Sequence, residues 1–495
     1  MNRLISVLLV AVLLLSALPF AGAEFTDNLL IKDDFKKAVS EMSEKKILGG
    51  FPDGSFAPTK TLTRAQAAKI LCVMLEGEEK ANALTKLDTG FADVPASHWA
   101  AKYVAYCVDR GVVAGVGDGK FDPDGTLSSG AFAKMLLVAY GEDGSKFTGA
   151  GWLKNVQDAL KSGFLGFRLE APSSAPMKRQ EAAQMAWNAL YLAEARAAAD
   201  KKDLSGSLPT SVPEKLSVLF IGTSGSADCM LSYLYELLQD AGVKEITLGN
   251  LRRSSTKLSD HAKFSVTQEK EYTYAKNTNG KWTSTGKKAK TMDDAVLDED
   301  WQYIVVQHGV SKSHDEGTYH PWQELLLYYL QQKRPNAVYG WNLNWAYDPY
   351  CKLEGFKQFD LDTVKHYEAL VKATVNQALP EKRFQFIIPV GTAVQNARTS
   401  FIGNAMTRDG SHLNQGIGRY VAAMTWCCKL TGVSPEKLSY LPSALVEDKK
   451  NFTIRDLNMA APGLLEALGK AAKESVANAI EKPFEITQSK NTVKP

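Results

Sequence analysis

The pattern of hydrophobic and polar positions changes character near residue 200. Up to residue 192, apolar residues recur at spacings of three and four, which predicts amphipathic helices separated by Gly/Asp turns. From residue 216, short continuous apolar runs alternate with amphipathic stretches, which predicts buried strands alternating with helices. A stretch rich in Ser, Pro, Gly and Lys lies between them, at residues 193–215. We therefore expect two folded regions joined by a linker.

The second region predicts a mostly parallel sheet covered by helices on both faces. We expect strands at 216–222, 244–250, 301–309, 336–347 and 384–391, and helices at 228–242, 319–335, 362–379 and 414–430. Residues 265–290, rich in Thr, Tyr, Lys, Asn and Gly, interrupt this series. Within them Asn279-Gly280 predicts a hairpin inserted at one edge of the sheet.

The first region repeats itself. Residues 47–75 are matched 65 positions later by residues 112–140, and a third, eroded copy spans 164–190. Each copy predicts a helix, a Gly/Asp turn, a short extended piece and a second helix. Ahead of the second copy, three aromatic residues are spaced to share one buried face of a helix: Trp99, Tyr103 and Tyr106.

These repeats carry four short motifs, namely Phe91-Ala92-Asp93-Val94, His98-Trp99-Ala100, Asp118-Gly119 and Thr63-Arg64-Ala65-Gln66. In this they resemble the surface-layer homology (SLH) family. The resemblance implies that residues 24–192 form three units of an α-helical, pseudo-trimeric module. It also implies a partner, because such modules attach proteins non-covalently to the secondary polysaccharide of a bacterial cell wall.

Two arginines are candidates for contact with that polymer. An arginine at a helix start offers a bidentate fork beside free backbone N–H groups, which suits an anionic sugar substituent. Arg64 has this place in the first copy and Arg179 in the third, whereas the second copy has Ser129 there. We therefore expect polymer binding at Arg64 and Arg179 and little at the second copy. The alternative for Arg64 is an exposed cation at the start of a helix.

The amino terminus predicts export. Arg3, an apolar run and the sequence Ala21-Gly22-Ala23 form the pattern of a signal peptide over residues 1–23. A membrane anchor is the alternative, but the run is short for crossing a bilayer. No later segment is long and apolar enough to span one, so we expect a secreted protein at the cell surface without a transmembrane segment after cleavage.

Composition narrows the partners and cofactors. The chain of 495 residues has 45% hydrophobic and 23% charged residues, which is typical of folded domains, and a net charge of only +3. The sequence contains no block of Lys and Arg interleaved with aromatic residues, the pattern that would predict a nucleic-acid partner. The 6 cysteines show neither a disulfide framework nor metal-ligand spacing, so we expect no structural metal and no cofactor.

The second region also contains candidate catalytic residues. Ser224 follows the first predicted strand, at the turn into a helix, where a serine can face solvent; it could equally be a helix cap, as could Ser226. A serine nucleophile needs a base, and the base needs an orienting partner. Of the 7 histidines, only His412 has an aspartate, Asp409, three residues earlier.

That combination, with the segments "LFIGTSGS", "ITLGNL", "WNLNWAY" and "TRDGSHLN", resembles the SGNH hydrolases of the GDSL type. The likeness covers about residues 216–487 and leaves 488–495 as a tail. It implies a flavodoxin-like, three-layer α/β domain with a parallel sheet. It further implies Ser224 as nucleophile, His412 as general base and acid, Asp409 as the orienting carboxylate, and the backbone N–H of Ser224 as an oxyanion donor.

This chain departs from the family at its oxyanion donors. Arg252 to Ser255 stand where a glycine pair is expected, and Gln307 stands near the place of an asparagine. Gln307 could donate from its amide or be a satisfied structural residue. Gly225, after the serine, predicts a more flexible turn. Asn344 and Trp345, after the fourth strand, could contact a sugar or belong to the core.

The sequence therefore predicts an exported, wall-attached serine esterase that removes acyl groups, most plausibly acetyl, from carbohydrate. Losing one oxyanion donor typically costs about 100- to 1,000-fold in rate, so a weak or inactive glycan-binding surface protein is the first alternative. A structural lattice protein is the second.

Overall fold

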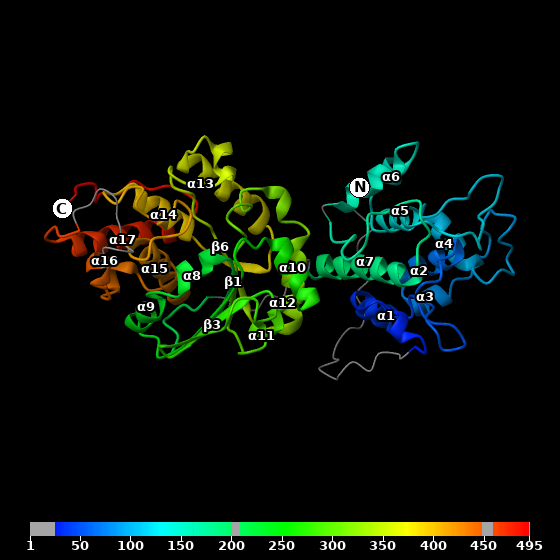
Figure 1. Cartoon of the computed structure of the whole chain (residues 1–495), viewed down its shortest axis with the longest axis horizontal. Coiled ribbons are helices and arrows are strands. Elements are labelled where there is room, and N and C mark those ends of the chain that lie inside the picture. The colour runs from blue at the N-terminus through cyan, green and yellow to red at the C-terminus, as the bar shows by residue number, and fades with distance from the viewer. Residues whose placement is uncertain (1–24, 162, 200–207, 448–458, 495) are drawn as a thin grey trace. The chain divides into compact units, whose positions relative to one another are not determined.

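The computed structural model describes residues 25–161, 163–199, 208–447 and 459–494. The chain forms two units that divide between Glu194 and Ala195 (Figure 1). The predicted signal peptide, residues 1–23, lies outside the described residues, and so do residues 200–207 of the predicted linker. Among the described helices, none combines the length and the apolar character needed to cross a membrane.

The first unit is built from short helices joined by turns, as the repeat pattern predicts. Thr63 starts the second helix of the first copy with a capping box, because its hydroxyl accepts from the N–H of Gln66 while the Gln66 side chain accepts from the N–H of Thr63. The helices are α1 Asp33–Glu44, α2 Arg64–Glu76, α3 Glu78–Asn82, α4 Ala101–Asp109, α5 Ser129–Ala139, α6 Trp152–Lys161 and α7 Arg179–Ala199.

One extended residue from each copy joins a ring of backbone hydrogen bonds. The N–H of Leu62 donates to the carbonyl of Met177 at 2.8 Å, Met177 donates to Leu127 at 2.8 Å, and Leu127 donates to Leu62 at 2.9 Å. All three side chains are buried. The ring thus closes the three copies on one another in a cyclic order.

The predicted aromatic face ahead of the second copy is only partly correct. Tyr103 is buried, but Trp99 is 53% exposed. The reason is that α4 begins at Ala101, with Ala100 at its N-cap. Trp99 therefore precedes the helix and does not share its buried face.

The second unit contains a seven-stranded sheet in the order β4-β3-β2-β1-β5-β6-β7. The strands are β1 Lys215–Gly222, β2 Glu245–Arg252, β3 Thr273–Thr278, β4 Lys281–Ser284, β5 Tyr303–Val306, β6 Val338–Asn342 and β7 Phe384–Ile388. Five are parallel, in the order 2-1-3-4-5 of flavodoxin-like sheets. The antiparallel hairpin β3–β4 turns at Asn279-Gly280 and forms one edge, as predicted.

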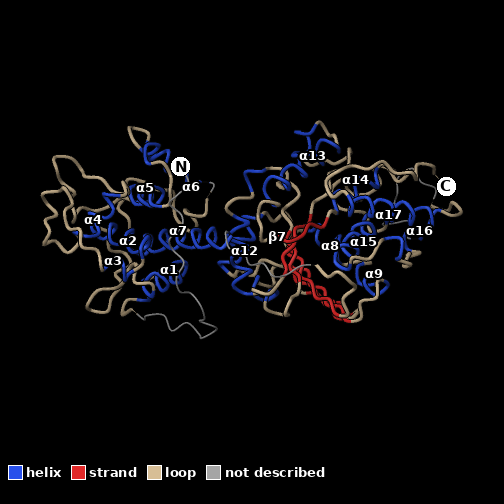
Figure 2. Tube along the Cα trace, turned by 180° about the vertical axis from the view of Figure 1, so that it is seen from behind, coloured by secondary structure: helices blue, strands red, loops and turns tan. Residues whose placement is uncertain are grey.

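Helices cover the sheet on both sides. Figure 2 shows α8, α9, α14, α15 and α17 on one side of the strands and α12 on the other. The helices are α8 Ser224–Met230, α9 Leu234–Asp240, α10 Leu258–Thr267, α11 Met292–Val296, α12 Trp322–Lys333, α13 Thr363–Ala373, α14 Val390–Arg398, α15 Ile417–Thr431, α16 Ala444–Glu447 and α17 Leu464–Glu481.

Several predicted elements differ from the structure. The strands expected over 301–309 and 384–391 are limited to Tyr303–Val306 and Phe384–Ile388, and Val390 already begins α14. The helix expected over 228–242 is divided into α8 and α9, because Tyr233 takes a left-handed conformation with φ 66°. The strand expected over 336–347 ends at Asn342, and residues 343–347 continue as a loop beyond the carboxyl end of β6. The carboxyl ends of β1, β5 and β6 are neighbours, so the segments that follow them meet at one edge of the sheet.

Candidate active site

Ser224 lies where β1 turns into α8. The side chain of Thr223 caps the helix by accepting from the N–H of Gly225 at 3.2 Å, and Ser224 is the first helical residue. Ser224 is partly exposed, whereas Ser226 is fully buried and donates its hydroxyl to the Thr223 carbonyl at 2.7 Å. The local structure therefore gives Ser226 the packing role and leaves Ser224 partly exposed.

The structure brings Ser224, His412 and Asp409 together in one chain of contacts. Oγ of Ser224 lies 2.8 Å from Nε2 of His412, and Nδ1 of His412 lies 2.6 Å from Oδ2 of Asp409. The other Asp409 oxygen accepts from the backbone N–H of His412 at 2.7 Å. A hydroxyl, an imidazole and a carboxylate in this order can transfer a proton from the serine while the ring keeps its tautomer.

Asp409 is held as a carboxylate. Burial opposes its ionisation, but hydrogen bonds from the backbone N–H groups of His412 and Ser411 and from the His412 ring lower the pKa of Asp409 from 3.8 to about 2. Asp409 thus keeps its negative charge, and its hold on the imidazole, throughout the neutral and mildly acidic range.

This lowered pKa predicts a pH-dependent contribution to stability. Because the folded pKa lies below the unfolded one, the ionised Asp409 stabilises the fold fully above about pH 3.8 and ceases to do so as the pH falls through about 2. The melting temperature of the second unit should therefore be lower in Asp409→Asn than in the wild type near pH 6, and the difference should shrink toward pH 2. Calorimetry across this range measures it, and a difference that does not vary with pH would contradict the assignment.

Asp228 ties the helix of the nucleophile to the loop of the histidine. Its carboxylate is 1% exposed and accepts from the N–H of Leu413 at 3.1 Å, from Nη1 of Arg408 at 3.0 Å and from Nη2 of Arg419 at 2.7 Å. Because α8 begins at Ser224 and Leu413 directly follows the histidine, this one buried anion fixes both segments. The sequence analysis missed Asp228; its signal was an acidic residue in a run of small and apolar residues, with arginines on both sides of the Asp409–His412 stretch.

A second buried ion pair holds the other side of the same loop. Asp348, at the end of the segment after β6, pairs with Arg398 at 2.6 Å and also accepts from the Thr407 hydroxyl. The Asp348 N–H donates to the Gly410 carbonyl at 2.9 Å. Gly410 has φ 91°, and a β-carbon there would lie 2.6 Å from Cα of Cys351, so this position requires glycine.

Trp345 packs between the serine turn and the histidine loop. Its ring is 1% exposed, and its indole N–H donates to the Ser411 carbonyl at 2.7 Å. A β-carbon on Gly225 would lie 3.0 Å from this ring, so close packing, rather than flexibility, explains the glycine after the serine. Trp345 therefore contacts the protein on both sides in this structure.

Gln307 and Asn344 lie beside the serine turn but bind each other. Nε2 of Gln307 donates to Oδ1 of Asn344 at 2.6 Å, and Nδ2 of Asn344 donates to the His308 carbonyl at 2.8 Å. Both side chains are buried. Of the two roles that the sequence allowed for Gln307, the geometry corresponds to the satisfied structural residue.

The segment that replaces the expected glycine pair follows β2, next to the end of β1. Arg253 donates its N–H to the Gly222 carbonyl at 3.2 Å, and Arg252 contacts the side chain of Asn250 at 3.2 Å. Ser255 has φ 58°, in the left-handed region that favours glycine. The backbone thus keeps a glycine-like conformation here without the glycine.

In the first unit, Arg64 and Arg179 make equivalent contacts. Each guanidinium donates to two backbone carbonyls of another copy and lies over a phenylalanine ring, that of Phe121 for Arg64 and that of Phe56 for Arg179. The accepting carbonyls are those of Phe121 and Ala114 for Arg64, and of Phe56 and Gly49 for Arg179. Arg64 is half-buried, whereas Arg179 is only 3% exposed.

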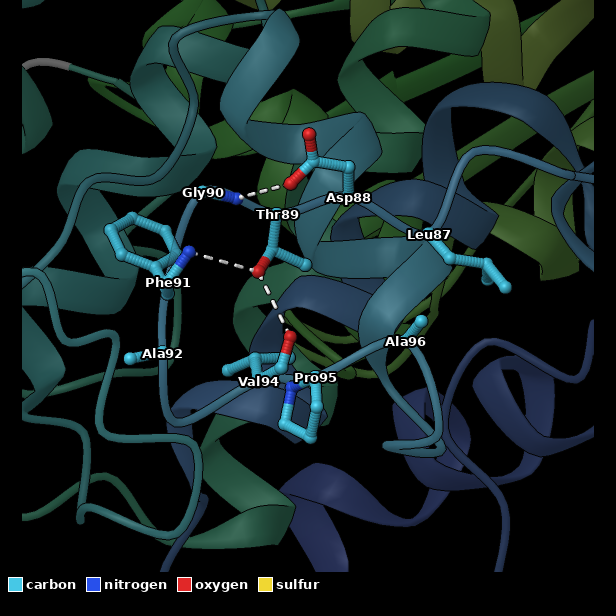
Figure 3. A pocket seen from close by; sticks show the side chains of 9 residues that line it. All are labelled: Leu87, Asp88, Thr89, Gly90, Phe91, Ala92, Val94, Pro95 and Ala96. Atoms are coloured by element: carbon cyan, nitrogen blue, oxygen red, sulfur yellow. Dashed lines mark hydrogen bonds between the residues drawn. The ribbon is translucent and has the colours of Figure 1, made fainter.

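A hollow of about 330 Å³ lies in the loop of residues 87–96, ahead of the second copy (Figure 3). Thr89 organises it, because its hydroxyl donates to the Val94 carbonyl at 3.0 Å and accepts from the N–H of Phe91 at 3.2 Å. All the lining residues belong to this one loop, 87–96. The hollow is therefore part of the loop's own fold, and its lining does not contain a nucleophile with a neighbouring general base.

The described part of the chain has no cluster of three or more His, Cys, Asp or Glu arranged to hold a metal ion. The 6 cysteines are all buried and unpaired.

Comparisons with known proteins assign the two units. Residues 217–459 match DUF4886, a domain of unknown function. A solved structure of a DUF4886 family protein from Bacteroides uniformis is 32% identical, covers 56% of this chain and 100% of its own, and superposes with a TM-score of 0.50. The chain belongs to the DUF4886 family. A solved structure from Slackia heliotrinireducens, provisionally assigned as an SGNH hydrolase, is 16% identical over 44% of this chain and 99% of its own, but its TM-score of 0.29 is too low to support an inference.

The first unit of this DUF4886 protein contains S-layer homology domains, matched at residues 31–68 and 90–133. A cell surface protein of Thermoanaerobacter kivui is 32% identical over 28% of this chain and 19% of its own length. The cellulosome-anchoring protein of Acetivibrio thermocellus is 34% identical over 18% of this chain and 20% of its own. The chain thus spans a fifth or less of these curated relatives. The S-layer homology domains indicate a cell-surface, wall-anchored protein.

Proposed function

We propose that the second unit is a serine esterase that removes acyl groups, in particular acetyl, from carbohydrate. The observation that carries this proposal is the continuous contact from Ser224 through His412 to Asp409, with distances of 2.8 and 2.6 Å. Two buried ion pairs hold these residues, at Asp228 and at Asp348, so the arrangement is built into the fold. The acetyl-carbohydrate substrate rests on the cell-wall location and on the resemblance to SGNH hydrolases.

The reaction needs only these side chains and water. Nε2 of His412 accepts the hydroxyl proton as Oγ of Ser224 attacks the ester carbonyl, and the backbone N–H of Ser224 stabilises the oxyanion. The imidazolium then gives its proton to the departing alcohol, which leaves an acyl-serine. A water molecule, deprotonated by His412, then attacks the acyl-serine carbonyl, and the imidazolium returns that proton to Oγ of Ser224 as the acyl–oxygen bond breaks and the acid leaves. Asp409 keeps the ring in the productive tautomer throughout.

Turnover of simple esters tests this function. Purified full-length protein should hydrolyse p-nitrophenyl acetate and release acetate from acetylated xylan. A rate equal to the buffer background with both substrates would contradict the esterase.

One observation favours a non-catalytic glycan-binding protein instead. The Gln307 amide donates to Asn344 and the Asn344 amide donates to the His308 carbonyl. These hydrogen bonds leave fewer side-chain donors for an oxyanion than a site with free amides would have. Bound oligosaccharide without ester hydrolysis would identify this second function.

For the first unit we propose a pseudo-trimeric module that binds a secondary wall polysaccharide. The cyclic hydrogen bonds among Leu62, Met177 and Leu127 support the three-part arrangement. Arg64 is half-buried and can reach the polymer directly. Arg179 is 3% exposed and therefore acts mainly through the turn that it holds. Ser129, at the matching place in the second copy, contacts the Ser173 carbonyl and offers no cation.

Arg64→Ala is expected to weaken binding to purified cell walls by about 10- to 150-fold, because a charge-assisted contact contributes roughly 1.5–3 kcal/mol. Sedimentation of the protein with walls measures this. Lys69→Ala, which removes the same charge from an exposed position on the same helix, is the control. Equal losses in both variants would show that net charge, rather than the Arg64 site, determines binding.

A further inference from the structure

The second unit has a polar cleft of about 490 Å³ apart from the serine, within the range of about 300–1,000 Å³ typical of small-molecule sites. Its side chains come from two loops at the carboxyl edge of the sheet, one after β5 and one after β6. They are Ser311, Lys312, His314, Asp315, Glu316 and Gln358.

One wall of the cleft is formed by the loop after β5. The first residues of this loop pack beside the serine turn. This loop starts with Gln307 and His308. The Gln307 amide would lie 3.4 Å from a β-carbon on Gly225, directly after the serine. The His308 carbonyl accepts from Asn344, on the segment after β6.

The other wall of the cleft is formed by the segment after β6. Earlier residues of this segment contact the loop that carries His412. Asp348 and Cys351 contact Gly410, which follows Asp409, and Gln358 lies seven residues beyond Cys351. A small core under both walls holds them together; it consists of Tyr347, Cys351 and Phe356, with Val310 and Phe359 packed against them. Both walls are therefore fixed to the same framework as the candidate active site.

The charges of the cleft are already paired within the protein. Lys312 lies 3.2 Å from Asp315, and Glu316 lies 3.3 Å from Lys372 and also accepts from the amide of Gln377 at 3.0 Å. A cleft whose cations and anions neutralise each other does not select an ionic ligand. Its lining is also too polar for an apolar one.

The uncharged groups of the cleft suit a ligand rich in hydroxyl groups. Gln358 donates its amide to Nε2 of His314 at 3.1 Å and to the Gly355 carbonyl at 2.6 Å, which leaves its amide oxygen for a ligand hydroxyl. The His314 ring packs edge-on against Phe359 at 5.0 Å between centroids. Burial lowers the pKa of His314, which favours the neutral ring, and because its Nδ1 is buried the ring shapes the cleft without presenting that nitrogen to a ligand. Neutral donors and acceptors beside carboxylates and a lysine match the alternating hydroxyls of a sugar.

We propose that this cleft is a subsite for a saccharide unit of the ester substrate. The claim that the bound saccharide belongs to the substrate rests on the proposed esterase function. Binding of a glycan in the cleft can be measured separately, without turnover. Isothermal titration of the full chain with xylohexaose, cellohexaose, chitohexaose and mannohexaose provides that measurement.

At least one of these oligosaccharides should bind the wild type, and Gln358→Ala and Lys312→Ala, one from each wall, should each raise its Kd by about 5- to 10-fold, the effect of one lost hydrogen bond. Lys357→Ala, next to Gln358 but outside the lining, should leave Kd unchanged. Binding of none of the four, or equal Kd values in wild type and both cleft variants, would overturn the subsite. Failure to hydrolyse esters while this binding pattern holds would instead overturn the esterase and leave a glycan-binding cleft.

Discussion

Ser224→Ala is expected to lower kcat for p-nitrophenyl acetate by about 10,000-fold or more. The hydroxyl is the atom that forms the acyl-enzyme, and no other serine oxygen among the described residues is hydrogen-bonded to Nε2 of His412. Losses of this size are typical when the nucleophile of such a triad is removed. The measurement is the initial rate at saturating ester, with far-UV circular dichroism to show that the fold is retained.

The control for this variant must be a serine outside the site. Ser284→Ala is suitable, because Ser284 is exposed on the edge strand β4. Ser226→Ala is less suitable, since its buried hydroxyl also accepts from the Asn250 amide at 3.0 Å and its loss would disturb the core. Ester hydrolysis that persists in Ser224→Ala at the wild-type rate would exclude Ser224 as the nucleophile.

Asp228→Ala is expected to reduce the free energy of unfolding of the second unit by about 3 kcal/mol. Removing one member of a buried ion pair typically costs about 3–5 kcal/mol. The lower end applies because Arg408, with its side chain 33% exposed, can regain some hydration. Urea unfolding of the full chain measures the change, taken from the transition in which the second unit unfolds.

The same variant should also lower kcat, by about 10- to 100-fold, because the serine and histidine segments lose their shared anchor and small displacements of reacting groups are costly. Asp228→Asn, which can still accept from the Leu413 N–H, should have a smaller effect on both quantities. Glu368→Ala, at an exposed position on α13, should stay within about 0.5 kcal/mol of the wild type. Unchanged stability and rate in Asp228→Ala would contradict the anchoring role.

The parallel sheet, its edge hairpin and the contact between Asp409 and His412 follow from patterns in the sequence, whereas the meeting of Ser224 with His412 is expected only from the resemblance to SGNH hydrolases. Continuous apolar runs separated by helices predict a parallel sheet, and Asn279-Gly280 specifies the hairpin through its backbone preferences. The spacing of Asp409 and His412 fixes their contact locally, since both belong to one short loop.

Other features depend on tertiary contacts that no local pattern carries. Tyr233 divides the predicted helix by taking φ 66°, a conformation that propensity alone disfavours. Asp228 is explained only by Arg408 and Arg419, about 180 and 190 residues away. Gly225 predicts a flexible turn from the sequence alone, because no local pattern shows that Trp345 packs against it.

Labelling with a fluorophosphonate, which traps an activated serine covalently, tests the catalytic assignment most directly. After incubation of the full chain with the reagent, tryptic peptides are mapped by mass spectrometry. An adduct is expected on Ser224 in the wild type and should be lost in His412→Ala, where the base is missing. An adduct on a different serine, or an unmodified Ser224 peptide in the wild type, would contradict the assignment.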